Sequence, residues 1–176
     1  MSHPKLNPVS YAIVKDRFNG LAVKEGIEIN KYLNPDKCRI MEMEEFFDFA
    51  NLPNHQLSIL EIGSGRGNYS IPLLQLGHKM TCVDISETSL NILKTTASML
   101  GLDKNLEEIY CGDFLNWDSK CKKYDLILGT DILHHILGGL DSLHRIFQKI
   151  STGLHQSGKI IFKEPNPLFP WRIYFF

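Results

Sequence analysis

The sequence lacks the features that mark membrane, secreted and metal-binding proteins. No window approaches the ~20 apolar residues that a membrane-spanning helix requires, and the polar residues 1–10 lack the apolar centre of a signal peptide. The cysteines, which are Cys38, Cys82, Cys111 and Cys121, include no C-x-x-C pair, and no histidine cluster has zinc-ligand spacing. We therefore expect a cytoplasmic protein with reduced cysteines and no bound metal.

An excess of charge of one sign is also missing. The 176 residues have a formal net charge of -1, so no global positive field attracts nucleic acid or an anionic membrane. Apolar residues make up 43% of the chain and charged residues 22%, which is ordinary for a globular protein, and the length suffices for one domain with a sizeable core. We therefore expect no nucleic-acid partner and no membrane span.

The most informative stretch runs from Leu57 to Asn68. An apolar run of strand length ends in Glu61, and glycines follow at positions 63, 65 and 67. Residues 69–76 then predict a helix. Glycine permits a sharp turn and close approach of a ligand, and the start of a helix offers unpaired N–H groups and a partial positive charge. The pattern favours a site for a nucleotide-like ligand over a turn with incidental glycines.

The spacing of the glycines argues against a dinucleotide as that ligand. The dinucleotide fingerprint is G-x-G-x-x-G, whereas here Asn68 occupies the third glycine position and Gly67 comes one residue early. Glu61 would also repel a pyrophosphate, because both are negatively charged. A carboxylate at this place suits a ligand with an ammonium group.

The remainder of the chain alternates between strands and helices, which predicts an α/β fold with a doubly wound, mostly parallel sheet and helices on both faces. The expected strands are residues 57–61, 79–84, 106–111, 124–129 and 159–163, in the order 3-2-1-4-5. Helices are expected at 69–76, 86–100 and 141–153. Residues 1–56 predict a helical N-terminal cap with helices at 22–33 and 39–50.

Acidic residues follow two of the expected strands. Asp84 ends the second strand, where a carboxylate accepts hydrogen bonds from ribose hydroxyls; its alternative role is to help cap the helix after Ser86. Asp113 follows the third strand in Gly112-Asp113-Phe114, where it could accept a hydrogen bond from an adenine amino group. The alternative for this segment is a simple turn.

The loop after the fourth strand contains Thr130, Asp131, His134 and His135. Ligands of open parallel sheets lie beyond the carboxyl ends of the strands, at the crevice between the first strand and its neighbour. Histidine is a common general base, but adjacent helical side chains diverge by about 100 degrees, so we expect one of the two in the pocket and favour His135. Glu164, after the fifth strand, either holds a substrate group or forms an ion pair.

The pattern Glu61-x-Gly63-x-Gly65-x-Gly67 resembles motif I of the class I, Rossmann-like S-adenosylmethionine (SAM)-dependent methyltransferases. The resemblance continues at Asp84 and at Gly112-Asp113-Phe114, and it implies SAM as the cofactor. The loop after the fourth strand resembles the small-molecule branch of the family, in which a V/I-L-x-H-like run stands at this place, and the D/N/S-P-P-Y signature of DNA adenine methylases is absent. The implied cofactor-binding residues are Glu61, Gly63, Ser64, Gly65 and Gly67 at the methionine end, Asp84 at the ribose, Ile85, Asp113 and Phe114 at the adenine, and Thr130 near the sulfonium. The implied catalytic residues are His135, His134 and Glu164.

The resemblance covers residues 57–167 as a SAM-binding Rossmann-like domain, between the 1–56 cap and an aromatic tail at 168–176. A full family member continues with a further helix and two strands, for which the tail is too short, so the last two strands are expected to be missing. The edge at Ile160–Phe162 would then be exposed. It would promote self-association unless the tail or a partner covers it, and the chain could be a truncated form.

The resulting prediction is a SAM-dependent methyltransferase that transfers a methyl group to a small-molecule acceptor by in-line displacement. One alternative is a truncated, non-catalytic SAM-binding protein or partner-dependent subunit, because the sheet is expected to be incomplete. A less favoured alternative is an NAD-dependent oxidoreductase, because Gly65 and Asp84 are separated by roughly the ~20 residues that such enzymes show.

Overall fold

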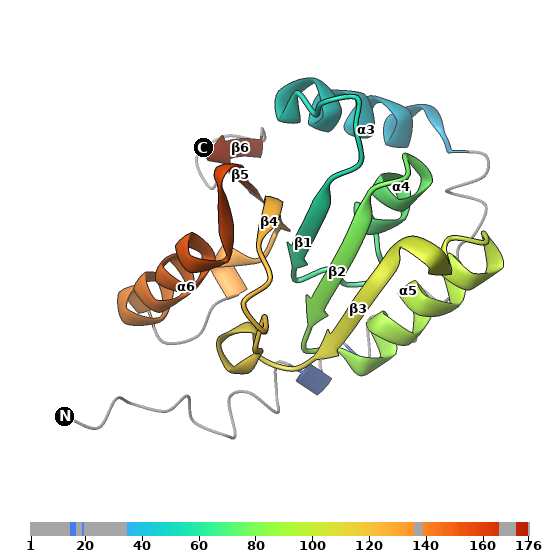
Figure 1. Cartoon of the computed structure of the whole chain (residues 1–176). Helices are drawn as coiled ribbons and strands as arrows, with labels where there is room; N and C mark the ends of the chain where they lie inside the picture. The colour runs from blue at the N-terminus through green and yellow to red at the C-terminus, as the bar shows by residue number, and fades with distance from the viewer. Residues whose placement is uncertain (1–14, 17–18, 20–34, 136–138, 166–171, 176) are drawn as a thin grey trace.

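A twisted sheet forms the centre of the molecule (Figure 1). The computed structural model describes residues 15–16, 19, 35–135, 139–165 and 172–175. Within these residues the sheet has six strands in the order β3-β2-β1-β4-β5-β6. The strands are β1 (Ser58–Ile62), β2 (Lys79–Asp84), β3 (Leu106–Cys111), β4 (Tyr124–Thr130), β5 (Leu154–Pro165) and β6 (Arg172–Phe175). The first five are parallel, which confirms the predicted α/β fold and its 3-2-1-4-5 order.

The expectation that the last two strands are missing is wrong in part, because one further strand from the tail covers the edge of β5. β6 pairs with β5 in an antiparallel arrangement, with Phe162 opposite Phe175 and Pro165 opposite Arg172. The open edge of β5 offers unpaired N–H and C=O groups, and four residues of the tail are enough to satisfy part of it. The predicted self-association rested on that edge and stays a prediction.

β5 is also longer than the predicted 159–163. Its first residue, Leu154, already pairs with Tyr124 of β4. The register then shifts, so that Lys159 lies opposite Leu126. Residues 154–158, which lie between the predicted helix and the predicted fifth strand, are therefore part of an extended strand. By contrast, β2 and β3 have the bounds that the sequence predicts.

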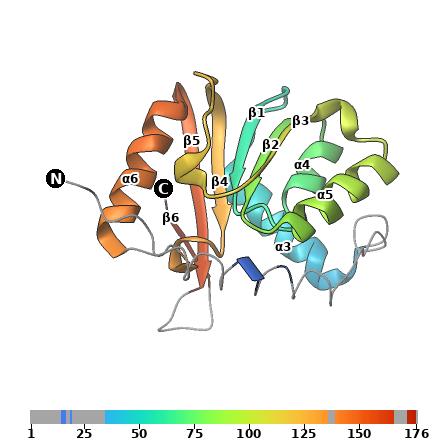
Figure 2. The ribbon, with the colours of Figure 1, turned by 90° about the horizontal axis from the view of Figure 1, so that it is seen from below.

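Helices cover both faces of the sheet. The described helices are α3 (Lys37–Ala50), α4 (Ser70–Gln75), α5 (Glu87–Met99) and α6 (Gly139–Gly153). Figure 2 shows α6 on one face and α4 and α5 on the other, and side chains of α3 join the core on the α4 side. The predicted helix at 22–33 lies outside the described residues. None of the described helices is long and apolar enough to cross a membrane.

The strands supply apolar side chains to two cores, one on each face. On β1, Ile59 packs in the core beneath α3, α4 and α5, whereas Leu60 and Ile62 pack in the core beneath α6. Successive side chains of a strand point to opposite faces, so a continuous apolar run fills both cores. A sheet buried on both faces leaves the ends of its strands as the accessible places for a ligand.

A buried polar cluster connects α3 to the sheet. Lys163 of β5 has only 1% of its surface exposed. Its Nζ donates to Tyr69 Oη at 2.7 Å and to Glu42 Oε1 of α3 at 3.1 Å, and Tyr69 Oη donates to the same glutamate oxygen at 3.0 Å. The cluster, defined as Glu42, Tyr69 and Lys163, pairs the buried ammonium with a carboxylate, as burial of a charge requires.

Another contact connects the N-terminal region to the carboxyl end of β2. Asn19 Oδ1 accepts a hydrogen bond from Ser86 Oγ at 2.8 Å and from Thr88 N at 3.2 Å. Both residues belong to the start of α5. Asn19 therefore lies at the edge of the sheet at which the predicted ligand residues lie.

Candidate functional site

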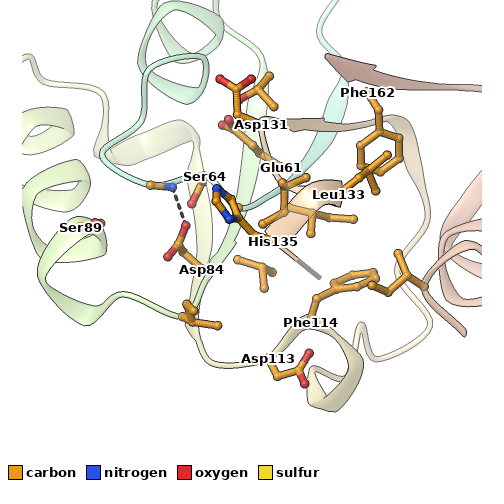
Figure 3. A pocket seen from close by; sticks show the side chains of 18 of the residues that line it. Glu61, Ser64, Asp84, Ser89, Asp113, Phe114, Asp131, Leu133, His135 and Phe162 are labelled. Atoms are coloured by element: carbon orange, nitrogen blue, oxygen red, sulfur yellow. Dashed lines mark hydrogen bonds between the residues drawn. The ribbon is translucent and has the colours of Figure 1, made fainter. Parts of the chain in front are cut away.

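A cavity of about 340 Å³ lies at the carboxyl ends of the central strands (Figure 3). Its wall comes from the loop after β1, the end of β2, the turn after β3, the loop after β4, and α6. This is the crevice at which an open parallel sheet binds its ligand. The following predicted residues line it: Glu61, Gly63, Ser64, Gly65, Asp84, Ile85, Asp113, Phe114, Thr130 and His135. Gly67, His134 and Glu164 are not in the wall.

The three glycines of the loop have left-handed backbones, with φ of 74°, 52° and 85° at Gly63, Gly65 and Gly67. Gly63 N donates to Val83 O at 2.8 Å and so ties the loop to β2. A Cβ at Gly63 would lie 2.8 Å from Ile132, and one at Gly67 would lie 3.0 Å from Ile71 and Leu93. A Cβ at Gly65 would meet nothing within 4 Å. Gly63 and Gly67 therefore serve packing, whereas Gly65 keeps the surface of the loop open.

Asp84 fixes the open part of the loop. Its Oδ2 accepts a hydrogen bond from Gly65 N at 2.8 Å, and its Oδ1 accepts one from Ser86 N at 2.7 Å. Burial raises the pKa of Asp84, and the N–H groups of Ser86, Gly65 and Ile85 oppose that rise. Asp84 bonds Ser86 N just before α5, as its alternative role predicts, and it also faces the cavity (Figure 3), so that its binding of a ribose stays a prediction.

Buried polar atoms lie beneath the loop. Glu61 has 1% of its surface exposed, and Ser70 Oγ donates to its Oε2. Ser70 Oγ also lies 3.1 Å from Cys82 Sγ, and burial, together with the charge of Glu61, raises the pKa of that thiol. Among the described residues, the buried Ser64 Oγ has no hydrogen-bond partner. A buried polar group without a partner is costly, so a polar ligand in the cavity would stabilise this hydroxyl.

The turn after β3 carries Asp113 and Phe114 into the wall. Gly112 N donates to Asp84 O at 2.8 Å, which joins the turn to the end of β2. The short 3₁₀ helix η2 (Phe114–Asn116) follows, and Asp113 Oδ1 caps it by accepting from Leu115 N at 2.9 Å. The turn predicted as the alternative is therefore real. The Asp113 carboxylate can still accept hydrogen bonds from a ligand, because a carboxylate accepts several.

The loop after β4 is held from β5. Glu164 Oε1 accepts hydrogen bonds from Ile132 N at 2.9 Å and Leu133 N at 2.7 Å, at the start of the 3₁₀ helix η3 (Leu133–His135). Its Oε2 lies 2.6 Å from His134 Nδ1. Glu164 is thus buried as a support for this loop, and the structure does not bring it or His134 to the cavity wall.

His135 is the histidine that reaches the cavity (Figure 3). The His134 and His135 rings lie 3.9 Å apart between centroids, yet only His135 belongs to the wall. The two side chains therefore divide as the sequence predicts, with one in the pocket. Asp131, also in the wall, has a left-handed backbone with φ of 53°, and its N donates to Lys163 O at 2.8 Å.

Sequence analysis missed the part of the wall that comes from α6 and β5. Ser142 and Ile146 of α6 and Phe162 of β5 line the cavity. Their spacing gives a partial signal, because residues 142 and 146 lie on one face of a helix. Nothing in the sequence showed that this face meets the cavity, since it could equally have packed on the sheet.

The charged groups of the wall favour a cationic ligand. Four acidic residues line the cavity: Glu61, Asp84, Asp113 and Asp131. Arg66 is a basic residue in the same wall. Carboxylates around a partly enclosed cavity create a negative potential that attracts positive groups. The site therefore suits a ligand with an ammonium or sulfonium group and hydroxyl donors.

A family model for a methyltransferase domain matches residues 59–158, which include the strand before the glycine loop, the cavity residues after β2, β3 and β4, and α6. The chain belongs to this methyltransferase domain family. The family that the glycine loop and the two acids predicted is therefore confirmed. The match ends within β5 and leaves β6 and α3 outside it.

The methyltransferase domain also has curated relatives. It is 29% identical over 87 residues to a ubiquinone biosynthesis O-methyltransferase of Caulobacter vibrioides, covering 49% of this chain and 34% of that protein. It is 25% identical over 135 residues to the enzyme of the same name from Methylocella silvestris, covering 76% of this chain and 44% of that protein. The chain thus spans less than half of the length of these relatives.

Solved structures share the fold of this methyltransferase domain. The magnesium protoporphyrin IX methyltransferase of Synechocystis PCC 6803, solved with bound SAM, has a TM-score of 0.68 and 18% sequence identity. That similarity covers 93% of this chain and 80% of the other. At this identity the similarity concerns the fold.

Proposed function

We propose that the chain binds SAM and transfers its methyl group to a small-molecule acceptor. The observation that carries the proposal is the convergence of three groups on one cavity: the open glycine loop, Asp84 after β2, and Asp113 after β3. The residues present fit this cofactor. Ser64 Oγ is buried without a partner in the described part of the chain, no atom stands where a Cβ of Gly65 would point, and the acids suit a cationic ligand.

Each part of the wall has a proposed role. Glu61, Ser64 and the glycine loop hold the methionine end, where Gly63 and Gly67 act through packing. Asp84 accepts hydrogen bonds from the ribose hydroxyls. Ile85, Asp113 and Phe114 surround the adenine, and Thr130 borders the sulfonium. These assignments follow the positions of the residues around the cavity and the order in which their strands neighbour one another.

Bound SAM supplies a methyl group on a positively charged sulfur, which an acceptor nucleophile displaces in line. The protein contributes mainly by orientation, because holding two reactants close together and aligned removes much of the barrier. His135, which lines the cavity, is proposed to orient the acceptor and to take its proton where the nucleophile must lose one. Glu164 and His134 are assigned a positioning role, since they fix the helix that carries His135.

The acceptor is proposed to be a small molecule with an apolar body and a hydroxyl group. Leu133, Ile146 and Phe162 supply apolar surface to the wall on the side of His135 and α6. The curated relatives are named for O-methyl transfer in ubiquinone biosynthesis, which agrees with such an acceptor. A cytoplasmic location and the absence of a nucleic-acid partner stay sequence-based predictions, which cell fractionation and binding assays test.

Binding of S-adenosylhomocysteine (SAH) tests the cofactor. Because SAH keeps the adenosine and amino-acid parts, we expect it to raise the melting temperature by several degrees at saturating concentration, whereas NAD leaves the temperature unchanged. Stabilisation by NAD alone would contradict the proposal. Transfer of label from methyl-labelled SAM to a panel of hydroxylated aromatic compounds then tests activity. Binding of SAH without transfer to any acceptor would support the non-catalytic alternative.

A further inference from the structure

Lys149 of α6 lies behind the turn that carries Asp113 and Phe114. Its Nζ donates a hydrogen bond to Leu115 O at 3.2 Å and another to Trp117 O. Both carbonyls belong to the end of η2, where carbonyl groups have no partner within a helix. A lysine at this end satisfies them; burial lowers the pKa of Lys149, and the carboxylates of Asp113 and Asp118 oppose that fall.

The same ammonium group also contacts the aromatic rings of the turn. Lys149 Nζ lies 5.0 Å from the centroid of the Phe114 ring and 5.9 Å from that of Trp117. Both rings are almost completely buried, and their centroids are 6.0 Å apart. Cation–π contacts of this length are favourable when the cation is partly desolvated. Lys149 therefore contacts the turn through its backbone and through its side chains.

Packing alone does not support the turn from this side. A second cavity, of about 210 Å³, lies between the turn and α6 and is lined by Phe114, Trp117 and Lys149, among others. Phe114 borders both this cavity and the larger one. Protein interiors normally hold their side chains by close packing. Where a cavity replaces packing, the position of the turn depends more strongly on the specific contacts of Lys149.

The helix that carries Lys149 also forms part of the main cavity. Ser142 and Ile146 line that cavity, and Lys149 follows them on the same face of α6 at spacings of four and three residues. On the far side of the turn, Trp117 Nε1 donates to Glu108 Oε1 of β3 at 2.9 Å. The turn is thus attached to β3 at one end and to α6 at the other.

We propose that Lys149 is a positioning residue for purine recognition, which sets the Asp113–Phe114 turn at the distance from α6 that the adenine ring requires. This inference rests on the proposed function of the same cavity. Loss of Lys149 should therefore change how well the protein distinguishes one purine from another. A residue that only stabilised the fold would leave that discrimination unchanged.

The test compares two ligands in each variant by isothermal titration calorimetry. SAH has the adenine amino group, and S-inosylhomocysteine has a carbonyl oxygen in its place. We expect the wild-type chain to bind SAH about tenfold more tightly, because an acidic side chain such as Asp113 pairs with the amino group and repels the oxygen. In Lys149→Met this ratio should fall to about two or less. The ratio is measured within one variant, so a change in the folded fraction cancels.

Two further variants serve as controls. Lys149→Arg should keep the ratio within about twofold of the wild type, since guanidinium also donates to carbonyls and stacks on aromatic rings. Lys123→Met removes a comparable hydrogen bond, from Lys123 Nζ to Thr152 O near the end of α6, and Lys123 lines neither cavity. It should leave the ratio unchanged.

Four results would contradict the inference or the proposed function on which it rests. An unchanged ratio in Lys149→Met, or an equal fall in Lys123→Met, would show that Lys149 has no special effect on purine recognition. A wild-type chain that binds SAH but does not prefer it would show that the turn does not recognise the amino group. A wild-type chain that does not bind SAH would contradict the proposed function itself.

Discussion

The carboxylate that holds the glycine loop, Asp84, also lines the cavity, whereas the carboxylate that holds the loop after β4, Glu164, lies outside the cavity wall. On the first side, Gly63 N bonds Val83 O, and Gly65 N bonds Asp84. On the second side, Glu164 takes the two N–H groups at the start of η3 and pairs with His134. The two sides of one cavity therefore depend on different interactions.

This difference indicates that binding and transfer can be separated by mutation. The glycine-loop side faces the proposed cofactor, and its changes should alter cofactor affinity. The β4 side carries His135, so changes to its support should alter the rate of transfer with less effect on cofactor affinity. The predictions below test this division, beginning with the largest expected effect.

Replacement of Asp84 should have the largest effect on binding. In Asp84→Asn the cavity loses a buried charge and part of its capacity to accept from hydroxyls, so we expect SAH to bind about 100-fold more weakly in calorimetry. Asp125→Asn is the matched control, because Asp125 Oδ2 accepts a hydrogen bond from Ser58 N at 2.8 Å but does not line the cavity. Equal losses in both variants would contradict a ligand-binding role for Asp84.

Alanine should mainly destabilise the fold at Gly67 and mainly weaken ligand binding at Gly65. In Gly67→Ala the new methyl group would crowd Ile71 and Leu93, and the positive φ adds strain, so we expect about 3 kcal/mol less stability in urea unfolding. In Gly65→Ala only the strain applies, which costs about 1 kcal/mol, while the methyl group enters the cavity. Gly65→Ala should therefore weaken SAH binding more than it weakens the fold. A Gly65→Ala variant that loses stability but keeps its affinity for SAH would show that the loop is not the binding surface.

Removal of the support on the β4 side should mainly slow transfer. Glu164→Ala leaves the N–H groups of Ile132 and Leu133 without their acceptor, so His135 loses its fixed orientation. We expect kcat to fall about tenfold, while the Kd for SAH changes by less than about threefold. Glu164→Gln keeps an oxygen acceptor and should recover most of the rate. A large loss of SAH affinity in Glu164→Ala would show that the two sides are not separable.

The smallest expected effect is a pH dependence of affinity. Burial raises the pKa of Asp84 above its ordinary 3.8, and the ionised form is the one that accepts hydrogen bonds from ribose. SAH affinity should therefore fall several-fold as the pH is lowered from about 8 through the raised pKa, and binding near that pKa should release a proton. Calorimetry in buffers of different ionisation enthalpy measures the release. Asp84→Asn should remove this pH dependence, whereas an affinity that rises toward acid pH would contradict it.

The glycine-loop side could be predicted from the sequence because its determinants are local. A strand, an acid and glycines at alternate positions specify the turn within a few residues, and Asp84 and Asp113 come directly after strands whose bounds the apolar runs indicate. Parallel pairing then brings these strand ends together at one edge. Local chemistry and a regular topology were sufficient to predict the residues that line the cavity on this side, except that Gly67 lies outside the wall.

The support of the other side could not be predicted, although Thr130 and His135 were, because the contacts that hold its loop join residues distant in the sequence. Glu164 lies 30 residues after His134, and nothing in either segment shows that their side chains meet. The same holds for Phe162 and Ile146, whose pattern predicts burial but not burial against a cavity. β6 was missed for a related reason, since a strand of four residues has too little pattern to indicate pairing.

The cluster of Glu42, Tyr69 and Lys163 has a consequence for local unfolding. If α3 left the sheet, the Lys163 ammonium would lose its bond to the Glu42 carboxylate, at a cost of up to about 3–5 kcal/mol. Tyr69 directly follows Asn68, which lines the cavity, so separation of α3 would also disturb the end of the glycine loop. We therefore expect amide hydrogens of α3 and of the segment around Tyr69 to exchange with solvent as one cooperative unit. Fraying of that helix and loss of the methyl-donor pocket would then be a single event.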